Sequence, residues 1–425
     1  MAPKLNPETS LKTAEGLVSV GQSHAALQEL SKTVLAKGFK GQQITALEPI
    51  MLRFVELCVD LRKGRLAKEG LMQYKNAAQN SSVNSIETVI KKFIALADAK
   101  VQDAQEKAEK AVALTDVDDL EAIETPESIL LGAVSGDQSK DRTDRALVTP
   151  WLKFLWESYR TALDTLSNNA RLEIIYQVRA ATRMLESVLI LSPFTQNIAQ
   201  QTFKFCLKHQ RKVEFRRLCE ILRQHLTKVA KYSHQAHAIN LTDADTLQRH
   251  LDTRFAQLNT SAELELWQEA FRSIEDIHNL LTMARTAVSK DGTKKGLGVR
   301  PAMMANYYEK LTKIFLTSAD GVESGVAVAG SHALFHASAL SRWYDVVRSI
   351  GGKSDEEMSK LAGQVLISAL AVPEMGVTAG KSDDAEEGKG RFGRLSSLLG
   401  LSRPPTRAGL LKDAVRAFKY HPHIY

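Results

Sequence analysis

One glycine-rich stretch comes close to a nucleotide-binding motif: Gly376-Val-Thr-Ala-Gly380-Lys381-Ser382. In a phosphate-binding loop four residues separate the two glycines, so that successive backbone N–H groups surround the phosphate. Here three residues separate Gly376 from Gly380, and the acidic run that begins at Asp383 would repel a phosphate. We therefore interpret this stretch as a surface loop and not as a nucleotide site.

Two pairs of histidines have spacings that a metal site can use. His332 and His336 are four residues apart and share a predicted helix face, but Ala333 stands where zinc proteases carry their catalytic glutamate. His234 and His237 have no third ligand nearby in the sequence. Packing in a core or an interface is the favoured interpretation of both pairs, and we expect no metal.

The remaining candidates for catalysis are weaker still. Gly296-Leu-Gly298 follows a predicted helix and not a strand, which argues against a dinucleotide site. No serine or cysteine lies in a nucleophile-elbow sequence. The cysteines lie far apart without CxxC spacing, as buried thiols of a reducing compartment do; they are Cys58, Cys206 and Cys219. We expect no catalytic residue, no cofactor and no enzyme.

Basic residues crowd two neighbouring predicted helices, where Glu214 and Glu220 are among the few acids that balance them. On the second helix they lie away from an apolar arc that runs from Phe215 to Val229, and the spacing places Arg216 and Arg223 on one flank of the outer face. The candidate patch comprises Lys208, Arg211, Lys212, Arg216, Arg217, Arg223, Lys228 and Lys231.

Such a patch can neutralise RNA phosphates through counterion release or meet an acidic protein. A merely solvated helix face is the competing interpretation. No aromatic residues alternate with these charges, so base stacking is not indicated. The net charge of +7 is compatible with a nucleic-acid partner but does not require one.

Helices account for most of the chain. Apolar residues recur at 3–4 spacing, whereas only 11 of 425 residues are proline and no set of alternating strands appears. Helix pairs of roughly 30–45 residues without an exact period predict an all-α, tetratricopeptide-like (TPR-like) solenoid. In one predicted helix Ala67, Gly70 and Ala78 are small enough to let a second helix approach closely. With no apolar run of about 20 residues and no signal peptide, we expect a soluble cytoplasmic protein.

Composition suggests four regions. An acidic and polar linker, with Pro126 and Pro150, separates the first two helical blocks, and two further loops are predicted at Gly321–Gly330 and Glu374–Gly393. Between these loops, Phe335, His336, Trp343 and Tyr344 lie on or beside one helix face, as candidates for core packing or an interface. The predicted regions are 1–111, 112–150, 151–298 and 299–425.

Several segments of the sequence resemble the N-terminal region of one protein family. That family is the largest PCI-containing core subunit of eukaryotic translation initiation factor three. The segments are Ala46–Met51, Val55–Gly64, Ala67–Asn76, Glu124–Leu131, Asp141–Arg145, Trp151–Trp156 and Glu214–Cys219. The stretch that contains Tyr307-Tyr308 and Leu334–Tyr344 is similar to the beginning of that protein's PCI domain. The resemblance implies helical repeats that lead into the helical part of a PCI domain, here truncated before its winged helix.

The same resemblance implies a non-catalytic scaffold in translation initiation and messenger RNA recruitment. Its implied partners are a sister PCI protein (the factor's c subunit), the factor's other subunits, and proteins and rRNA of the small ribosomal subunit near the mRNA exit, with mRNA itself a further candidate. No membrane and no small-molecule substrate are implied. Two alternatives stay open at this point: a PCI subunit of another large complex, such as the proteasome lid, and an autonomous RNA-binding helical module.

Overall fold

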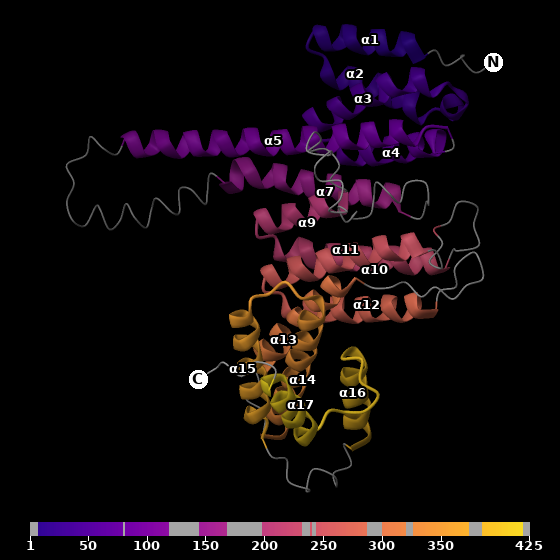
Figure 1. Ribbon diagram of the computed structural model, residues 1–425. Helices are drawn as coiled ribbons and strands as arrows, with labels where there is room; N and C mark the ends of the chain where they lie inside the picture. Colours follow the sequence, from indigo (N-terminus) through magenta and orange to yellow (C-terminus); the bar gives the residue numbers. More distant parts are fainter. Residues whose placement is uncertain are drawn as a thin grey trace. The chain divides into compact units, whose positions relative to one another are not determined.

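The computed structural model covers residues 1–425 and describes residues 7–79, 81–118, 144–167, 198–231, 239, 244–286, 300–319, 326–373 and 385–419. Within these ranges the regular structure is entirely helical and contains no strand (Figure 1). The all-α prediction is confirmed. The segment Gly376–Ser382, the His234 and His237 pair, and Gly296–Gly298 lie outside the described residues.

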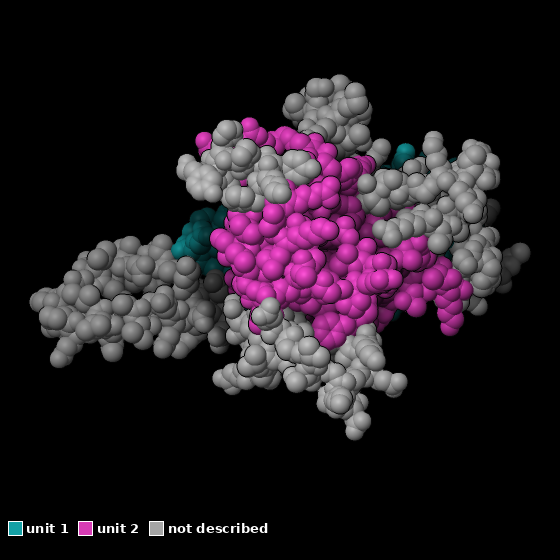
Figure 2. All heavy atoms as spheres, turned by 60° about the horizontal axis from the view of Figure 1, so that its bottom comes forward, with its two compact units in different colours: residues 1–176, 197–202, 232–239 teal, residues 177–196, 203–231, 240–425 magenta. Residues whose placement is uncertain are grey.

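The chain forms two compact units, drawn in two colours in Figure 2. Unit 1 contains residues 1–176, 197–202 and 232–239, and unit 2 contains residues 177–196, 203–231 and 240–425. The region boundaries expected from composition stay a prediction.

In unit 1, consecutive helices pack against one another: α1 against α2, α3 against α4 and α5, and α5 against α7. Their apolar stripes form the core, with Phe54, Tyr74 and Phe93 almost wholly buried. This stacking of neighbours is the arrangement predicted for a helical repeat. The elements are α1 (Pro7–Ser19), α2 (Ser23–Leu35), the 3₁₀ helix η1 (Lys37–Gly41), α3 (Ile44–Asp60), α4 (Gly64–Ala78), α5 (Val83–Asp118), the π-helical turn η3 (Asp144–Val148) and α7 (Thr149–Leu166).

The contact between α3 and α4 depends on a glycine. A Cβ atom on Gly70 would lie 3.0 Å from Cζ of Phe54 and closer still to Cε1 of that ring. Only a residue without a side chain lets the ring fit against the α4 backbone. The predicted close approach of two helices at small residues is therefore confirmed.

In unit 2 the pairs α11–α12, α13–α14, α14–α15 and α15–α17 are in contact, and α12 also packs against α13. Of α9 (Ile198–Lys208), residues 203–208 belong to this unit. The other helices are α10 (Lys212–Lys231), α11 (Ala244–Glu263), α12 (Trp267–Thr286), α13 (Pro301–Ala319), α14 (Val326–Ile350), α15 (Asp355–Ala371), α16 (Ala385–Leu398) and α17 (Arg407–Lys419).

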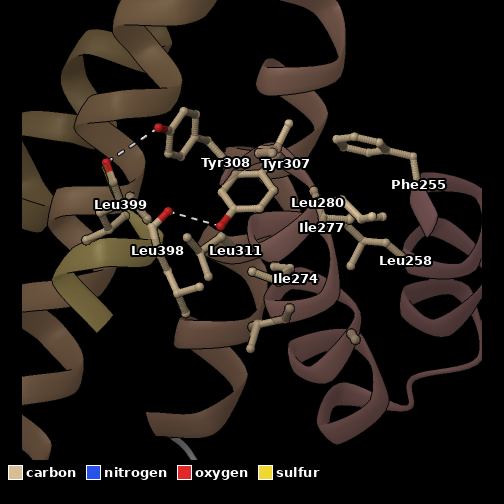
Figure 3. Packing of buried hydrophobic residues seen from close by; sticks show 14 of the residues in the cluster. Phe255, Leu258, Ile274, Ile277, Leu280, Tyr307, Tyr308, Leu311, Leu398 and Leu399 are labelled. Carbon is tan, nitrogen blue, oxygen red and sulfur yellow. Dashed lines mark hydrogen bonds between the residues drawn. The ribbon is translucent and has the colours of Figure 1, made fainter. Parts of the chain in front are cut away.

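Two tyrosines of α13 connect the main core of unit 2 to the end of α16 (Figure 3). The Tyr307 hydroxyl donates to the backbone oxygen of Leu398 at 3.0 Å, and the Tyr308 hydroxyl donates to that of Leu399 at 3.4 Å. Both rings are buried among residues of α11, α12 and α14, including Phe335. Each buried hydroxyl thus has the hydrogen-bond partner that burial requires.

A second core cluster lies among α14, α15 and α17. Leu361 and Val365 of α15 belong to it together with Leu410 and Ala414 of α17. The buried Tyr344 of α14 donates its hydroxyl to the backbone oxygen of Ala417 at 3.3 Å. The C-terminal helix is therefore part of the packed unit.

Two helices extend into stretches that the sequence predicted as loops. Helix α14 begins at Val326, inside Gly321–Gly330, and α16 begins at Ala385, inside Glu374–Gly393. In the first case Val326-Ala-Val-Ala is compatible with a helix, because two of its four residues have the highest helix propensity. In the second, an alanine followed by two glutamates starts the helix. In the prediction, the small residues of the first stretch and the glycines and charges of the second outweighed these helix formers.

Candidate interaction surfaces

Helix α10 has an apolar face on one side and a charged face on the other. Phe215, Leu218, Cys219, Leu222 and Val229 are buried, which confirms the predicted arc. Phe215 also meets Phe203 of α9, with ring centroids 6.1 Å apart. The packing of this arc fixes the orientation of α10 and turns its opposite face outward.

Most of the predicted basic patch is exposed. The side chains of Lys212, Arg216 and Arg217 make no ion pair or hydrogen bond with the described residues, and all three residues are exposed. Arg211 differs, because it is half-buried and its Nε lies 3.5 Å from Glu214 Oε1. We call the exposed members the α10 basic face; it comprises Lys208 at the end of α9 and five residues of α10, Lys212, Arg216, Arg217, Lys228 and Lys231.

Arg223 does not belong to that face, and its predicted place on the outer flank is wrong. Its Nη2 lies 3.0 Å from Glu269 Oε2 and its Nε lies 2.9 Å from Asp276 Oδ2, both on α12. Only 20% of its side chain is exposed. The spacing does place Arg216 and Arg223 on one flank, but α12 covers that flank at Arg223 and not at Arg216.

The two carboxylates also affect the pKa of Arg223. Burial by itself would lower its pKa, but the charges of Asp276 and Glu269 and their hydrogen bonds raise it above the ordinary value. The guanidinium therefore stays charged inside the contact. A half-buried charge of this kind stabilises the fold only while its partners remain in place.

The polar contact continues to α11. The buried Arg254 has Nη1 3.7 Å from Asp276 Oδ2 and donates to Gln257 Oε1 at 2.7 Å. Gln257 in turn donates to the Ser273 hydroxyl at 2.8 Å. Helices α10, α11 and α12 thus share one polar network, to which α10 contributes Arg223.

The four residues predicted on α14 divide into two groups. Phe335 and Tyr344 are each 1% exposed, and Phe335 packs between Phe315 and Phe392 with ring centroids 6.0 and 5.6 Å apart. Trp343 and His336 are only half-buried. Phe335 and Tyr344 are therefore core residues, whereas an interface contact stays a prediction for the other two.

Neither half-buried residue forms part of a reactive site. Burial lowers the pKa of His336, so its ring is neutral at physiological pH. The Trp343 ring has Lys353 Nζ 5.9 Å from its centroid, within the range of a cation–π contact. Within the described part of the chain, no group of three His, Cys, Asp or Glu side chains is arranged to hold a metal ion.

Sequence reasoning missed a groove of about 640 Å³ between α14 and α17, with residues 401–406 along one side. Arg342, Asp345 and Arg348 line it at three-residue spacing on α14, and Asp413 and Arg416 line it on α17. That spacing is a visible signal in the sequence, but it does not reveal that the two helices face each other.

Among the described helices, none is long and apolar enough to cross a membrane.

Comparison with known proteins gives one consistent family. The family described as "eIF3a, PCI domain, TPR-like region" matches residues 8–424. The A subunit of eukaryotic translation initiation factor 3 from Mycosarcoma maydis is 59% identical over 426 residues, which cover 98% of this chain and 37% of the relative. The corresponding protein of Aspergillus niger, with the same name, is 51% identical over 440 residues, covering 97% of this chain and 38% of the relative.

The chain thus spans little more than a third of the length of these relatives. A solved circular tandem repeat protein aligns over 98% of this chain and 89% of its own, at 13% identity and a TM-score of 0.24. That likeness is too weak to bear on the fold.

Proposed function

We propose that this chain, which belongs to the eIF3a family with its PCI domain and TPR-like region, is a non-catalytic scaffold of eukaryotic translation initiation factor 3. The observation that carries the proposal is the 59% identity to an eIF3 A subunit over 98% of the chain. It acts in the cytoplasm, where it holds sister subunits and the small ribosomal subunit together during initiation. The relatives' name argues against the proteasome-lid alternative.

The proposed contact with sister subunits lies in the α13–α17 part of unit 2. Trp343 and His336 are half-buried there, so part of each remains for a partner to cover. Large aromatic residues supply much of the binding energy of protein interfaces. The PCI domain of the factor's c subunit is the proposed partner.

The proposed contact with the small ribosomal subunit is the α10 basic face. Lys212, Arg216 and Arg217 are exposed and unpaired among the described residues, so they can neutralise phosphates of rRNA without breaking contacts inside the protein. Arg223 takes no part, because α12 holds its charge.

A charge-reversal experiment tests this contact. The triple variant Lys212→Glu, Arg216→Glu and Arg217→Glu should weaken binding to purified small ribosomal subunits by tenfold or more, most strongly at low salt. Co-sedimentation measures the affinity. The melting temperature should stay close to that of the parent, since exposed charges contribute about 1 kcal/mol or less.

A matched control reverses three exposed cations of unit 1, Lys12→Glu, Arg65→Glu and Lys107→Glu, with the same change of net charge. It should bind like the parent. An equal loss in both triples would mean that net charge alone drives binding and would refute the assignment to α10. Unchanged binding by the α10 triple would mean that the face is only solvated.

An autonomous RNA-binding module is the second candidate, and the same unpaired cations favour it. Such a module would bind free single-stranded RNA in a salt-dependent manner as an isolated chain, whereas the scaffold needs the folded ribosomal surface. Fluorescence anisotropy with a labelled RNA distinguishes the two. Binding of free RNA as tight as that of ribosomal subunits would favour the module.

A further inference from the structure

The groove between α14 and α17 is lined by residues of three segments of unit 2. Helix α14 contributes Arg342 and Asp345, helix α17 contributes Asp413 and Arg416, and the connection before α17 contributes Arg403 among residues 401–406. The buried Tyr344, held by its hydrogen bond to Ala417, lies at the same groove. With a volume of about 640 Å³, it is in the size range of sites that enclose a ligand or a short peptide.

Five charged side chains line this groove without forming a salt bridge. In the described part of the chain, the side chains of Arg342, Arg403, Arg416, Asp345 and Asp413 make no close ion pair or hydrogen bond, although the charges of Arg342 and Arg416 act on Asp345. Elsewhere in unit 2 arginines do pair, as Arg223 does with two carboxylates. With Arg348, four arginines line this concave surface against two aspartates, so positive charge is in excess there.

The groove also has apolar walls. Leu401, Pro404, Pro405 and Leu410 line it together with the charged side chains. A proline has no backbone N–H to satisfy and presents a rigid apolar ring, so this side of the groove suits a chain with apolar groups of its own. A phosphodiester backbone offers no such groups.

We propose that the groove between α14 and α17 binds an extended acidic peptide segment of a partner protein, whose carboxylates pair with Arg342, Arg403 and Arg416. Guanidinium and carboxylate groups match in geometry and form two parallel hydrogen bonds. The backbone N–H groups of the peptide donate to Asp345 and Asp413, which a phosphate chain cannot do. The two aspartates thus disfavour a phosphate chain, whose backbone carries acceptors and negative charge only.

This groove shares no residue with the α10 basic face. The proposed peptide contact and the proposed ribosome contact can therefore be refuted independently, since each is tested with its own variants and its own probe.

The direct test uses the 425-residue chain and a fluorescein-labelled synthetic peptide that alternates glutamate with alanine. Fluorescence anisotropy measures its affinity near physiological salt. The double variant Arg342→Gln and Arg416→Gln should weaken binding by tenfold or more. A matched double, Lys360→Gln and Lys412→Gln, removes the same charge from exposed positions outside the groove and should bind like the parent.

Two further variants separate the roles within the groove. Arg403→Gln, on the connection before α17, should weaken binding several-fold without touching either helix. Asp413→Asn keeps an acceptor and removes one negative charge, so it should bind the acidic peptide several-fold more tightly. Thermal unfolding followed by circular dichroism checks that each variant is folded. If the double variant does not fold, the affinity of Arg403→Gln for the peptide tests the proposal.

Three results would overturn the proposal. The first is no binding of the peptide to the parent chain at concentrations on the order of 100 μM, which is weak for a protein contact. The second is an equal loss in the groove double and the control double. The third is binding of a labelled uridylate oligomer that depends on Arg342 and Arg416 while the peptide does not bind, since the groove would then recognise phosphate.

Discussion

Arg223 of α10 and Glu269 of α12 form an ion pair, with Nη2 of the arginine 3.0 Å from Oε2 of the carboxylate. Arg216 occupies the same flank of α10 two turns earlier and is exposed. The two residues have the same type and the same helical phase. They differ in what lies opposite, because α12 passes α10 at Arg223 with two carboxylates that face it.

Arg223→Gln and Arg216→Gln therefore form a matched pair of variants, each of which removes one positive charge from α10. The first removes two charge-assisted hydrogen bonds, leaving Glu269 with only Arg272 and Asp276 with only the more distant Arg254, and should lower the free energy of unfolding by about 1.5–3 kcal/mol. The second should change it by less than about 0.5 kcal/mol. Urea unfolding followed by circular dichroism measures both. An equal effect of the two substitutions would contradict the distinction drawn between them.

Gly70→Ala tests the contact between α3 and α4. In an unhindered helix, alanine in place of glycine stabilises by roughly 0.5–1 kcal/mol. At Gly70 the new methyl group would meet the Phe54 ring, which is itself fully buried and has no room to turn away. We expect a net loss of about 1–3 kcal/mol, seen as a lower melting temperature.

Gly16→Ala is the control for that substitution. Gly16 lies in α1 of the same unit, is exposed, and has nothing within 4 Å of the Cβ position. The melting temperature should therefore rise slightly. If Gly70→Ala also raised it, the helices would not need a glycine at their contact.

Local spacing predicted the faces of individual helices well. The buried arc of α10 and the small residues of α4 are in the places that the 3–4 pattern indicated. Helix α17 shows the limit of such a pattern: of its apolar residues Leu410 is buried, but Val415 is 47% exposed and Ala414 is buried instead. Alanine adds little to an apolar pattern, so the pattern did not show that α17 packs through its small residues.

Features that depend on two distant segments could not be predicted in the same way. The partners of Arg223 lie 46 and 53 residues further along the chain, and nothing near position 223 indicates them. The groove likewise combines Arg342 with Arg416, whose helices meet only through the fold. A one-dimensional pattern gives the phase of a side chain on its helix but not the neighbour that covers it.

The three cysteines should be unreactive in the folded protein. All are buried, and burial raises the pKa of Cys58 to about 12, with Cys206 also raised to about 12 by burial and by the nearby charge of Glu214. Because the thiolate is the reactive form, iodoacetamide should modify none of them near neutral pH. In denaturant all three should react, as intact-mass spectrometry would show. Rapid labelling of any one in the native protein would mean that its helix opens locally.

His250 gives unit 2 a specific dependence on pH. It lies buried in α11, where desolvation first, and then the charges of Arg254 and Arg249, lower its pKa from 6.5 to about 3. The folded state therefore keeps this ring neutral, whereas the unfolded chain takes up a proton below about pH 6.5. The stability associated with His250 is complete above its unfolded pKa and is lost as the pH falls from about 6.5 toward 3.

Below about pH 6.5 the unfolded chain binds one more proton than the folded chain at this residue, which costs about 1.4 kcal/mol for each pH unit. Urea unfolding at pH values of about 7.5 and 5.5 should therefore show a loss of roughly 1.4 kcal/mol from His250. His250→Gln should remove that part of the loss, whatever its effect on stability at neutral pH. His24→Gln, which replaces an exposed histidine of unit 1, should keep the slope of the parent. If both variants kept that slope, the His250 ring would accept a proton within the fold, and its helix would be less tightly packed than its burial indicates.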